Sequence, residues 1–334
     1  MIRYDIKAYT KEWTYITTIN PNIVMNDISF SSNVNGGLWQ LSLNLALNFG
    51  DTTFHGGEII KVILYNERYK QGRQIYMWFV SQISRVYDTN KWYIKLVCLW
   101  IASLLTSVLF TWTYNTTVES VLNSIISQFN SKYSWNLITI KQIDEYEENI
   151  NVEFKAWTSC QEAIKQVNDI VNYYWFIDAE GNFYFRKKWT QTEHIMANKQ
   201  EVESMNLNYN IESLVNRILV ARKDGTVKTY ENNLSQSTYW IKEAYNNQSN
   251  IVDEATQDEF WNNYIEQYKN PKNASTVVVN NEYDIESIEP WDTITVVNSE
   301  YEIKNLTIEK INYSPSKVTL TLEENESLWS VINE

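Results

Sequence analysis

The first 115 residues alternate between apolar and polar positions, which is the pattern of half-buried β-strands. In the clearest case, Leu41, Leu43, Leu45 and Leu47 share one face, and polar or small residues occupy the other. The segments with this pattern are 13–19, 23–30, 38–49, 58–66, 74–87 and 91–101. Turn signals rich in Gly, Asn and Asp separate these segments. Six short strands at this spacing predict an antiparallel barrel or sandwich.

After residue 115 the apolar period changes from two to 3.6. Thr116 and Glu119 have the spacing of a capping box, and apolar residues follow at helical spacing as far as Phe129. A second helix is predicted to begin near Ser159, with Glu162 three residues later. The run YYWFID, a short turn with one Gly, and the run FYFRKK then predict a β-hairpin.

The strand pattern returns in the C-terminal third. Asp224-Gly225 separates two alternating segments and is a strong signal for a two-residue hairpin turn. A helix is predicted at 256–269, where Thr256 and Glu259 have capping-box spacing. Further strands are predicted at 274–281, 293–297, 301–312 and 317–323.

Together these patterns predict an α+β protein that is mainly β. Two barrel-like antiparallel β domains, at residues 1–115 and 201–334, flank a small α/β domain of two helices and a hairpin at 116–200. The second barrel carries a helical insertion near 250–272. At ~100–200 residues per domain, the length of 334 residues accommodates this organisation.

Composition narrows the class of protein. The chain has eight Gly, four Pro, two Cys and two His, and 44% of its residues are hydrophobic. It is therefore neither collagen-like nor intrinsically disordered, and it has too few Cys for a disulfide scaffold. The most apolar run covers residues 96–110, which is shorter than the ~20 residues of a membrane helix. We expect two buried strands there and no membrane span.

The net charge of −13 is unevenly distributed. Residues 1–115 carry a net charge of +3, whereas residues 280–334 carry −9. Because a protein that grips DNA needs a basic surface to neutralise phosphates, this acidic chain is not expected to hold nucleic acid. An acidic wall would instead let DNA slide past.

The sequence contains none of the common motifs of hydrolases, metalloproteases, nucleotide-binding loops or redox dithiols. His55 and His194 have no ligand-spaced neighbours and are predicted to be ordinary exposed histidines. Cys98 lies in an apolar run. Cys160 would lie in the first turn of a helix, where a thiol pKa can fall, but no His is near it in sequence.

Two acidic segments are explained as loops. Asp144–Glu148 could supply the carboxylate pair of a glycosidase, but such a charge run is typical of a solvated loop. Asp178–Asn182 faintly resembles a calcium loop but lacks the later ligands, so a hairpin turn is expected. We therefore predict no enzyme, and no catalytic, cofactor-binding or metal-binding residues.

The 14 Trp are spread almost evenly from Trp13 to Trp329. A sugar-binding platform would need several of them to converge on one surface. The even spread favours packing in the core.

Nearly the whole chain resembles the tail hub proteins of tailed bacteriophages, also called baseplate hub or tail-tip proteins. Three C-terminal segments carry the resemblance, at 212–235, 267–279 and 288–324, together with the pattern W-x-S-x-x-E-A-I from Trp157 and the later WFID-x-x-G-x-FYFR. The resemblance is a pattern of elements rather than an invariant motif. One departure is STYWIKEAY at 237–245, where hubs often have a Gly-Arg pair. Many relatives also continue into an enzyme or fibre domain, which we do not expect here.

The resemblance implies a structural virion protein at the tail tip, assembled in the host cytoplasm. Three subunits with two similar barrels each would form a homotrimeric ring whose pseudo-sixfold symmetry matches a hexameric tail tube or distal tail ring. The implied partners are that hexamer, the tape-measure protein, tip or fibre proteins, and DNA that passes a gated channel without specific binding. Alternating β domains of opposite charge would attract each other around such a ring. The alternatives are a receptor- or carbohydrate-binding tail protein, suggested by the Trp content, and a cell-wall hydrolase.

Overall fold

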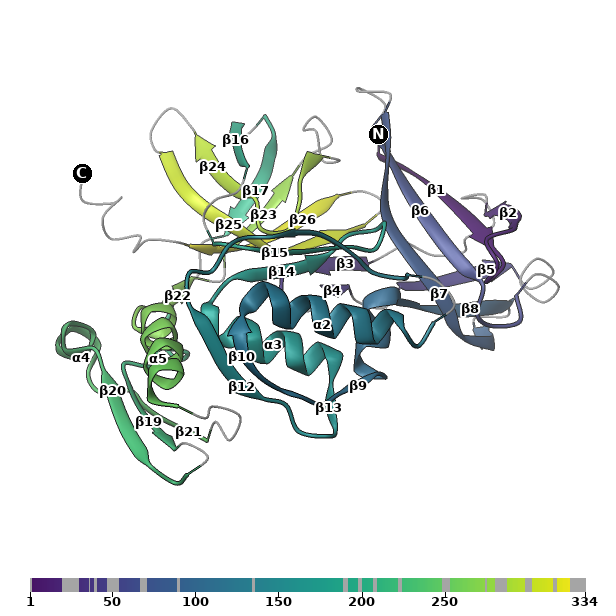
Figure 1. Ribbon diagram of the computed structural model, residues 1–334. Helices are drawn as coiled ribbons and strands as arrows, with labels where there is room; N and C mark the ends of the chain where they lie inside the picture. The colour runs from purple at the N-terminus through teal and green to yellow at the C-terminus, as the bar shows by residue number, and fades with distance from the viewer. Residues whose placement is uncertain are drawn as a thin grey trace.

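The structure is a computed structural model that describes most of the 334-residue chain (Figure 1). The described residues are 2–19, 30–35, 37–38, 41–46, 54–66, 71–88, 91–133, 136–188, 192–197, 200–206, 209–221, 224–247, 253–273, 275–279, 287–297, 302–314 and 317–324. Several residues of the predicted strands lie outside them, at 23–29, 39–40, 47–49, 274, 280–281 and 301, as does Trp329. The protein is α+β and mainly β, as predicted, with two large sheets and a helical middle region (Figure 1).

The N-terminal sheet has the strand order β2-β1-β6-β7-β8-β5. Its strands are β1 (Ile2–Tyr9), β2 (Tyr15–Ile19), β5 (Leu41–Ala46), β6 (Ile59–Asn66), β7 (Gln71–Asp88) and β8 (Lys91–Trp100). Neighbouring strands in this sheet are antiparallel. The predicted apolar face is confirmed for Leu41, Leu43 and Leu45, which are buried between half-buried neighbours.

The apolar run at residues 96–110 is only partly strand. After β8, a short 3-10 helix, η2 (Ile101–Thr106), precedes the two-residue strand β9 (Leu109–Phe110). The Ser103 hydroxyl donates a hydrogen bond of 2.6 Å to the Trp100 carbonyl. Such local hydroxyl–backbone bonds compete with strand pairing, so the expectation of buried strands holds for β8 and not for the turn that follows it. Among the described helices, none is long and apolar enough to cross a membrane.

The middle region contains two helices and several short strands. They are β10 (Thr113–Thr117), α2 (Val118–Asn130), β11 (Thr139–Ile143), β12 (Asn149–Glu153), β13 (Thr158–Ser159), α3 (Cys160–Val171), β14 (Tyr174–Ile177) and β15 (Asn182–Arg186). Ser159 caps α3 as predicted, because its hydroxyl accepts a hydrogen bond from the Glu162 amide. The predicted Thr116 cap of α2 was wrong. Thr116 is still paired with Ile150 in the β10–β12 ladder, and Thr117 caps the helix.

Strands β14 and β15 form the predicted hairpin. Asp178 organises its turn, since one carboxylate oxygen accepts hydrogen bonds of 2.9 Å from the Glu180 and Asn182 amides. Gly181 has a φ of +85°, and its carbonyl accepts a hydrogen bond from the Thr139 amide at the start of the parallel pairing between β11 and β15.

The C-terminal sheet curves into a half-barrel (Figure 1). Its main path has the order β16-β24-β25-β26-β23-β17, formed by β16 (Glu193–Ala197), β17 (Val202–Asn206), β23 (Ser275–Val279), β24 (Thr293–Val297), β25 (Glu302–Tyr313) and β26 (Val318–Glu324). Strand β16 pairs with β24 in parallel, and the other pairs on this path are antiparallel. Two strands from near the N-terminus, β3 (Phe30–Asn33) and β4 (Gly37–Leu38), join this sheet through β25.

An aromatic cluster lies where β3 connects the two large sheets. The Phe30 ring lies edge-to-face with Tyr76 of β7, at 4.3 Å between centroids, and stacks on Tyr313 of β25 at 4.9 Å. The Tyr4 hydroxyl of β1 donates a hydrogen bond of 2.9 Å to the Ser314 carbonyl. Because all four rings are buried, the two sheets share one continuous hydrophobic core.

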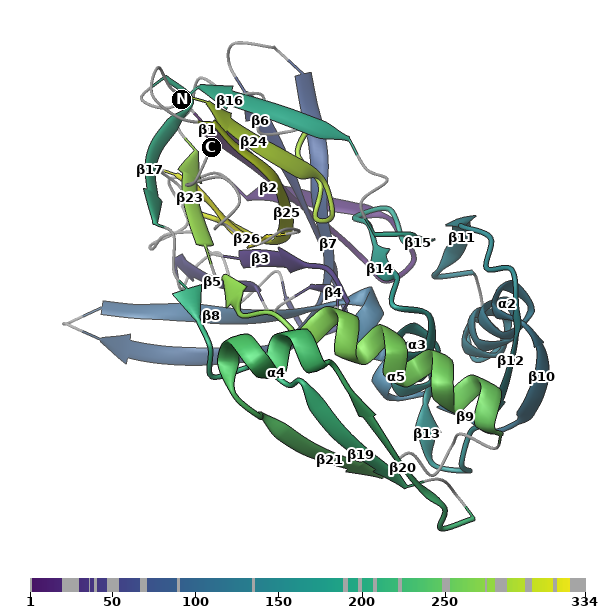
Figure 2. The ribbon, with the colours of Figure 1, turned by 90° about the vertical axis from the view of Figure 1, so that its left-hand side faces the viewer.

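A lobe packs against a long helix on one side of the molecule (Figure 2). The lobe consists of β19 (Arg217–Ala221), β20 (Val227–Glu231), α4 (Asn233–Tyr239) and β21 (Glu243–Asn247), and the helix is α5 (Glu254–Tyr268). Two short strands, β18 (Tyr209–Asn210) and β22 (Lys272–Asn273), pair with each other beside it. The predicted Asp224-Gly225 hairpin is confirmed, but it forms a three-stranded sheet of its own with β21.

Two features of this part differ from the sequence predictions. Helix α5 begins earlier than expected, because the Asp253 carboxylate accepts a hydrogen bond from the Thr256 amide at 2.9 Å and so caps the helix. The predicted Thr256 cap was wrong, since Asp is a stronger cap than Thr and lies one turn upstream. Helix α4 was not predicted at all, because it is too short to show an apolar period.

Substituting two glycines separates backbone strain from steric overlap. Gly181 and Gly225 have φ values of +85° and +83°, but only at Gly181 would a Cβ come within 2.5 Å of a backbone atom, the Leu137 carbonyl oxygen. We expect Gly225→Ala to lower the free energy of unfolding by about 1–2 kcal/mol, the cost of left-handed backbone. Gly181→Ala should lower it by a further ~1–3 kcal/mol of overpacking. Urea denaturation measures both losses, and equal losses would contradict the proposed overlap.

Candidate functional site

The two histidines lie in different environments. His55 is exposed, as predicted, in a turn where the Glu58 carboxylate accepts hydrogen bonds from the His55 and Gly56 amides. The prediction that His194 is exposed was wrong: it is buried in β16, and its Nε2 lies 2.9 Å from Oδ2 of Asp292. The alternating pattern of β16 could have predicted the burial of His194, because His194 shares the buried face of the strand with Met196.

The His194–Asp292 pair fastens the parallel strand β16 to the half-barrel. The same Asp292 oxygen accepts a hydrogen bond from the Glu289 amide at 2.9 Å, so the buried carboxylate has two partners. The partners are 98 residues apart in sequence. The pair is buried and links two segments that are distant in sequence.

Both cysteines are buried and free. Burial raises the pKa of the Cys160 thiol to about 11, which opposes the lowering that a helix N-terminus can cause. Burial also raises the pKa of Cys98. Neither thiol is therefore an activated nucleophile at neutral pH.

The two acidic segments are structural, in line with the loop interpretation. Asp144 accepts hydrogen bonds from the Gln142 side chain and the Lys187 amide, which ties β11 to the end of β15. Asp178 holds the β14–β15 turn and also accepts from the Tyr184 hydroxyl. Across the part of the chain that the structure describes, no group of three His, Cys, Asp or Glu residues could hold a metal ion.

The nine tryptophans whose burial the structure describes divide into a buried and an exposed group. Trp100, Trp175, Trp261 and Trp291 are buried, as core packing predicts. Trp13, Trp92, Trp112, Trp157 and Trp240 are exposed. The five exposed side chains come from five separate segments of the sequence, so closeness in sequence does not gather them on one surface. Core packing thus explains only part of the Trp content.

The most exposed of these side chains, Trp240, follows α4 in the lobe and is 80% exposed. Its φ of 59° and ψ of 175° lie in a region that residues other than Gly rarely adopt. The fully buried Asn216 holds this backbone: its Nδ2 donates to the Trp240 carbonyl at 2.7 Å, and its Oδ1 accepts from the Lys242 amide at 2.8 Å. A buried amide therefore clamps a strained backbone that displays an exposed indole.

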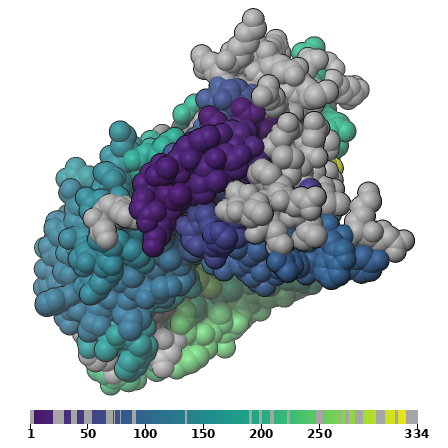
Figure 3. Space-filling model, turned by 90° about the vertical axis from the view of Figure 1, so that its right-hand side faces the viewer, coloured from purple at the N-terminus to yellow at the C-terminus, as the bar shows by residue number. Residues whose placement is uncertain are grey.

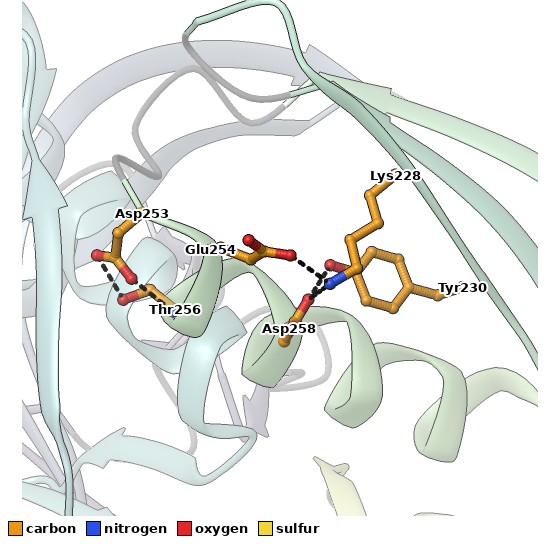
Figure 4. A network of polar contacts seen from close by, with 6 residues as sticks. All are labelled: Lys228, Tyr230, Asp253, Glu254, Thr256 and Asp258. Carbon is orange, nitrogen blue, oxygen red and sulfur yellow. Dashed lines mark hydrogen bonds and ion pairs between the residues drawn. The ribbon is translucent and has the colours of Figure 1, made fainter.

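A polar network fixes the lobe to α5 (Figure 4). The Lys228 amine from β20 lies 2.9 Å from Glu254 and 2.6 Å from Asp258 on α5. The Tyr230 hydroxyl also donates to Asp258, at 2.5 Å. Because these groups are partly exposed, each ion pair is worth little alone, but together they orient the lobe.

A cavity of about 500 Å³ lies between α3 and α5. Amide side chains dominate its lining, including Asn168, Asn172 and Asn263, and Asn263 donates to the Ile170 carbonyl across the helix pair. Asp169 also lines it, and burial raises the pKa of this carboxyl to about 6. The cavity is thus polar, and its lining also includes the charged residues Glu162, Lys165 and Lys188.

No protein-family model and no curated protein matches this sequence. Three solved structures are similar over almost their whole length. The tail protein from Neisseria meningitidis MC58 has a TM-score of 0.70 at 9% identity, covering 96% of this chain and 97% of that chain. The 43 kDa tail protein of prophage MuSo2 from Shewanella oneidensis has a TM-score of 0.67 at 9% identity, covering 97% and 98%. Prophage tail protein gp18 from Listeria monocytogenes has a TM-score of 0.62 at 14% identity, covering 98% and 97%.

These likenesses establish the fold. The chain has the fold of phage tail proteins, as the resemblance in its sequence implied. At such low identity the likeness does not assign roles to individual residues, so the exposed groups of this chain have to be interpreted from its own structure.

Replacing Trp240 by Gly should stabilise the isolated subunit. The substitution relieves a backbone strain of ~1–3 kcal/mol and removes a side chain that buries little, against an entropy cost of ~0.5–1 kcal/mol. We expect the free energy of unfolding to rise by about 1 kcal/mol in urea denaturation of the monomer. Trp157→Gly is the matched control, because Trp157 is 74% exposed without a positive φ and should lose stability. A loss at both positions would contradict the strain at Trp240.

Asp169 should make stability depend on pH. Burial raises its folded pKa to about 6, above the 3.8 of the free carboxyl, so the folded state binds the proton more tightly and stability falls as pH rises from about 4 to about 6. Asp169→Asn should therefore be more stable than the wild type at pH 7, by roughly 1–2 kcal/mol. Denaturation at pH 4 should show little difference between the two proteins. An equal difference at both pH values would assign the effect to packing instead.

Proposed function

We propose that this chain is a structural protein of a phage tail, and that it acts as a hub at the tail tip. The supporting observation is the likeness to tail proteins over 96–98% of the chain and 97–98% of theirs.

The proposed hub is a homotrimeric ring. Each subunit contributes two β domains, residues 1–115 and 201–334, with residues 116–200 between them. Three copies then present six β domains to a hexameric tail tube or distal tail ring. The core shared by the two large sheets supports this proposal, because it lets each subunit act as one rigid unit in the ring.

The ring would occupy the virion tail tip after assembly in the host cytoplasm. The hexamer above it, the tape-measure protein within the tail, and tip or fibre proteins below it are the proposed partners. DNA would pass the gated channel without specific binding, and the net charge of −13 suits a wall that does not hold phosphates.

The cavity between α3 and α5 favours a second candidate, a receptor- or carbohydrate-binding tail protein. Its amide-rich lining beside Tyr264 and Tyr268 suits a neutral, hydroxyl-rich ligand. A glycan array tests this candidate. Binding that Asn172→Ala abolishes would support it, and an array without binding would count against it.

The oligomeric state tests the hub. Sedimentation velocity at about 100 µM should show a particle of three times the 39.5 kDa chain mass, and negative-stain images should show a threefold ring with a central channel. A protein that remains monomeric, both alone and when mixed with its tail-tube or distal-tail hexamer, would contradict the proposal.

A further inference from the structure

We propose that the cavity between α3 and α5 binds a neutral pyranose sugar, and that the bound sugar fastens α5 and its lobe to the middle region. The ligand class rests on the second candidate function above, whereas the atoms that hold the ligand and its effect on the lobe go beyond it. Three observations carry the inference: buried polar atoms without a protein partner, an aromatic wall opposite them, and the place of the cavity between separate parts of the chain.

Three side chains that line the cavity each have a buried polar atom with no hydrogen-bond partner among the residues that the structure describes. These atoms are the indole Nε1 of Trp175 on β14 and the amide oxygens of Gln166 and Asn168 on α3. Trp175 is 1% exposed and Asn168 is 8% exposed. Because an unpaired buried polar atom costs stability, such a cluster at one cavity indicates a partner from outside the chain.

Hydroxyl groups suit this set of one donor and two acceptors. A hydroxyl donates one hydrogen bond and can accept others. Neighbouring hydroxyls on one ring can therefore accept from the Trp175 indole and donate to the amide oxygens of Gln166 and Asn168. A ligand with acceptors alone would leave both amide oxygens unpaired.

The charged side chains of the lining balance each other. Glu162 and Asp169 are acidic, whereas Lys165 and Lys188 are basic. Glu162 and Lys165 are exposed, and Lys165 also interacts electrostatically with Asp169. A charged ligand would meet a like charge as well as an opposite one, so the lining favours a neutral ligand.

An aromatic wall lies on the α5 side of the cavity. Phe260, Tyr264 and Tyr268 follow at four-residue spacing, which places their rings on one side of the helix. Tyr264 stacks on Phe260 at 6.3 Å between centroids and on Tyr268 at 4.5 Å. A pyranose has a face of C–H groups and an edge of hydroxyls, so its face can pack on these rings while its hydroxyls reach α3. The volume of about 500 Å³ falls within the ~300–1,000 Å³ of small-molecule sites.

The cavity lies where separate parts of the chain meet. Asn246 of β21 and the rings of α5 line one side, whereas α3, Trp175 and Asn35 beside β3 line the other. Figure 2 shows α5 beside α3, and Figure 3 shows the green surface of the lobe and α5 bordering the middle region. The bond from Asn263 to the Ile170 carbonyl already crosses this junction. A ligand that contacts both sides adds further bonds across it and stabilises the docked lobe.

Titration calorimetry with the full chain tests the ligand class. D-glucose, D-galactose and N-acetyl-D-glucosamine are the neutral probes, each at up to about 20 mM, so that a dissociation constant of ~1 mM would still give nearly full occupancy. D-glucuronate and D-glucosamine are the matched charged probes, and glycerol has hydroxyls without a ring face. We expect at least one neutral sugar to bind at least ten times more tightly than each of these three.

Equal or tighter binding of a charged probe or of glycerol would overturn the neutral pyranose as the ligand. No binding by any sugar would overturn the inference together with the second candidate function, and it would assign the buried atoms to water. The hub would stand in either case, because its test is the oligomeric state.

Asn168→Leu separates a ligand site from a structural role. Leu has the branched shape of Asn without its polar atoms, so the melting temperature should rise by about 2 °C or more while sugar affinity falls at least ~10-fold. Gln161→Leu is the matched control on α3, because Gln161 does not line the cavity, and it should leave the affinity unchanged. A lower melting temperature for Asn168→Leu would assign its amide to the fold and count against the inference. Unchanged affinity in this variant would place the sugar elsewhere, which overturns the inference but leaves a carbohydrate-binding protein standing.

Hydrogen exchange tests the effect on the lobe. At about 20 mM of the bound sugar, backbone amides of β21 and α5 should exchange at least ~5-fold more slowly, whereas those of β1 should not change. The Asn168→Leu protein should show no such protection. Sugar binding that leaves the exchange of β21 and α5 unchanged would overturn the fastening of the lobe.

Discussion

The packing of Phe30 between Tyr76 and Tyr313 joins the two large sheets, and the arrangement of the rest of the molecule depends on it. Strand β3 lies near the N-terminus in sequence but pairs with β25 near the end of the chain. The Phe30 side chain of β3 therefore packs against both sheets. Because buried aromatic pairs add specific geometry to a large buried area, this junction fixes the angle between the sheets. The helices of the middle region then pack below a framework that is already rigid.

Local signals predicted much of this fold. The turn at Asp224-Gly225, the cap at Ser159 and the alternating leucines from Leu41 each depend on residues a few positions apart, and each is confirmed. The errors at Thr116 and Thr256 are also local, because a capping pattern does not say whether an adjacent strand or a stronger cap competes for the same backbone. The β3–β25 pairing joins residues about 280 positions apart, and no local pattern carries that information.

The candidate sites show the same division. The sequence patterns correctly predicted that Asp178 lies in a turn and that His55 is exposed, since both features depend on residues that are close in sequence. His194 was misjudged because its partner Asp292 lies in a distant strand. The fourteen tryptophans were assigned to one role, yet burial depends on the whole fold, and composition cannot separate Trp240 from Trp175. Asn216, whose amide holds the Trp240 backbone, has no sequence signature as a clamp.

The exposed Trp240 side chain is attached to a rigid part of the molecule. An exposed indole at the end of a flexible loop would lose conformational entropy on binding, which weakens association. Here Asn216 has already ordered the Trp240 backbone, and Lys228 with Asp258 has already oriented the lobe on α5. Helix α5 in turn packs on α3, whose neighbouring strand β14 bonds to Asn35 beside the β3 crossing. A continuous chain of packed elements therefore connects the aromatic junction to the displayed side chain, so the exposed indole is attached to a rigid part of the subunit.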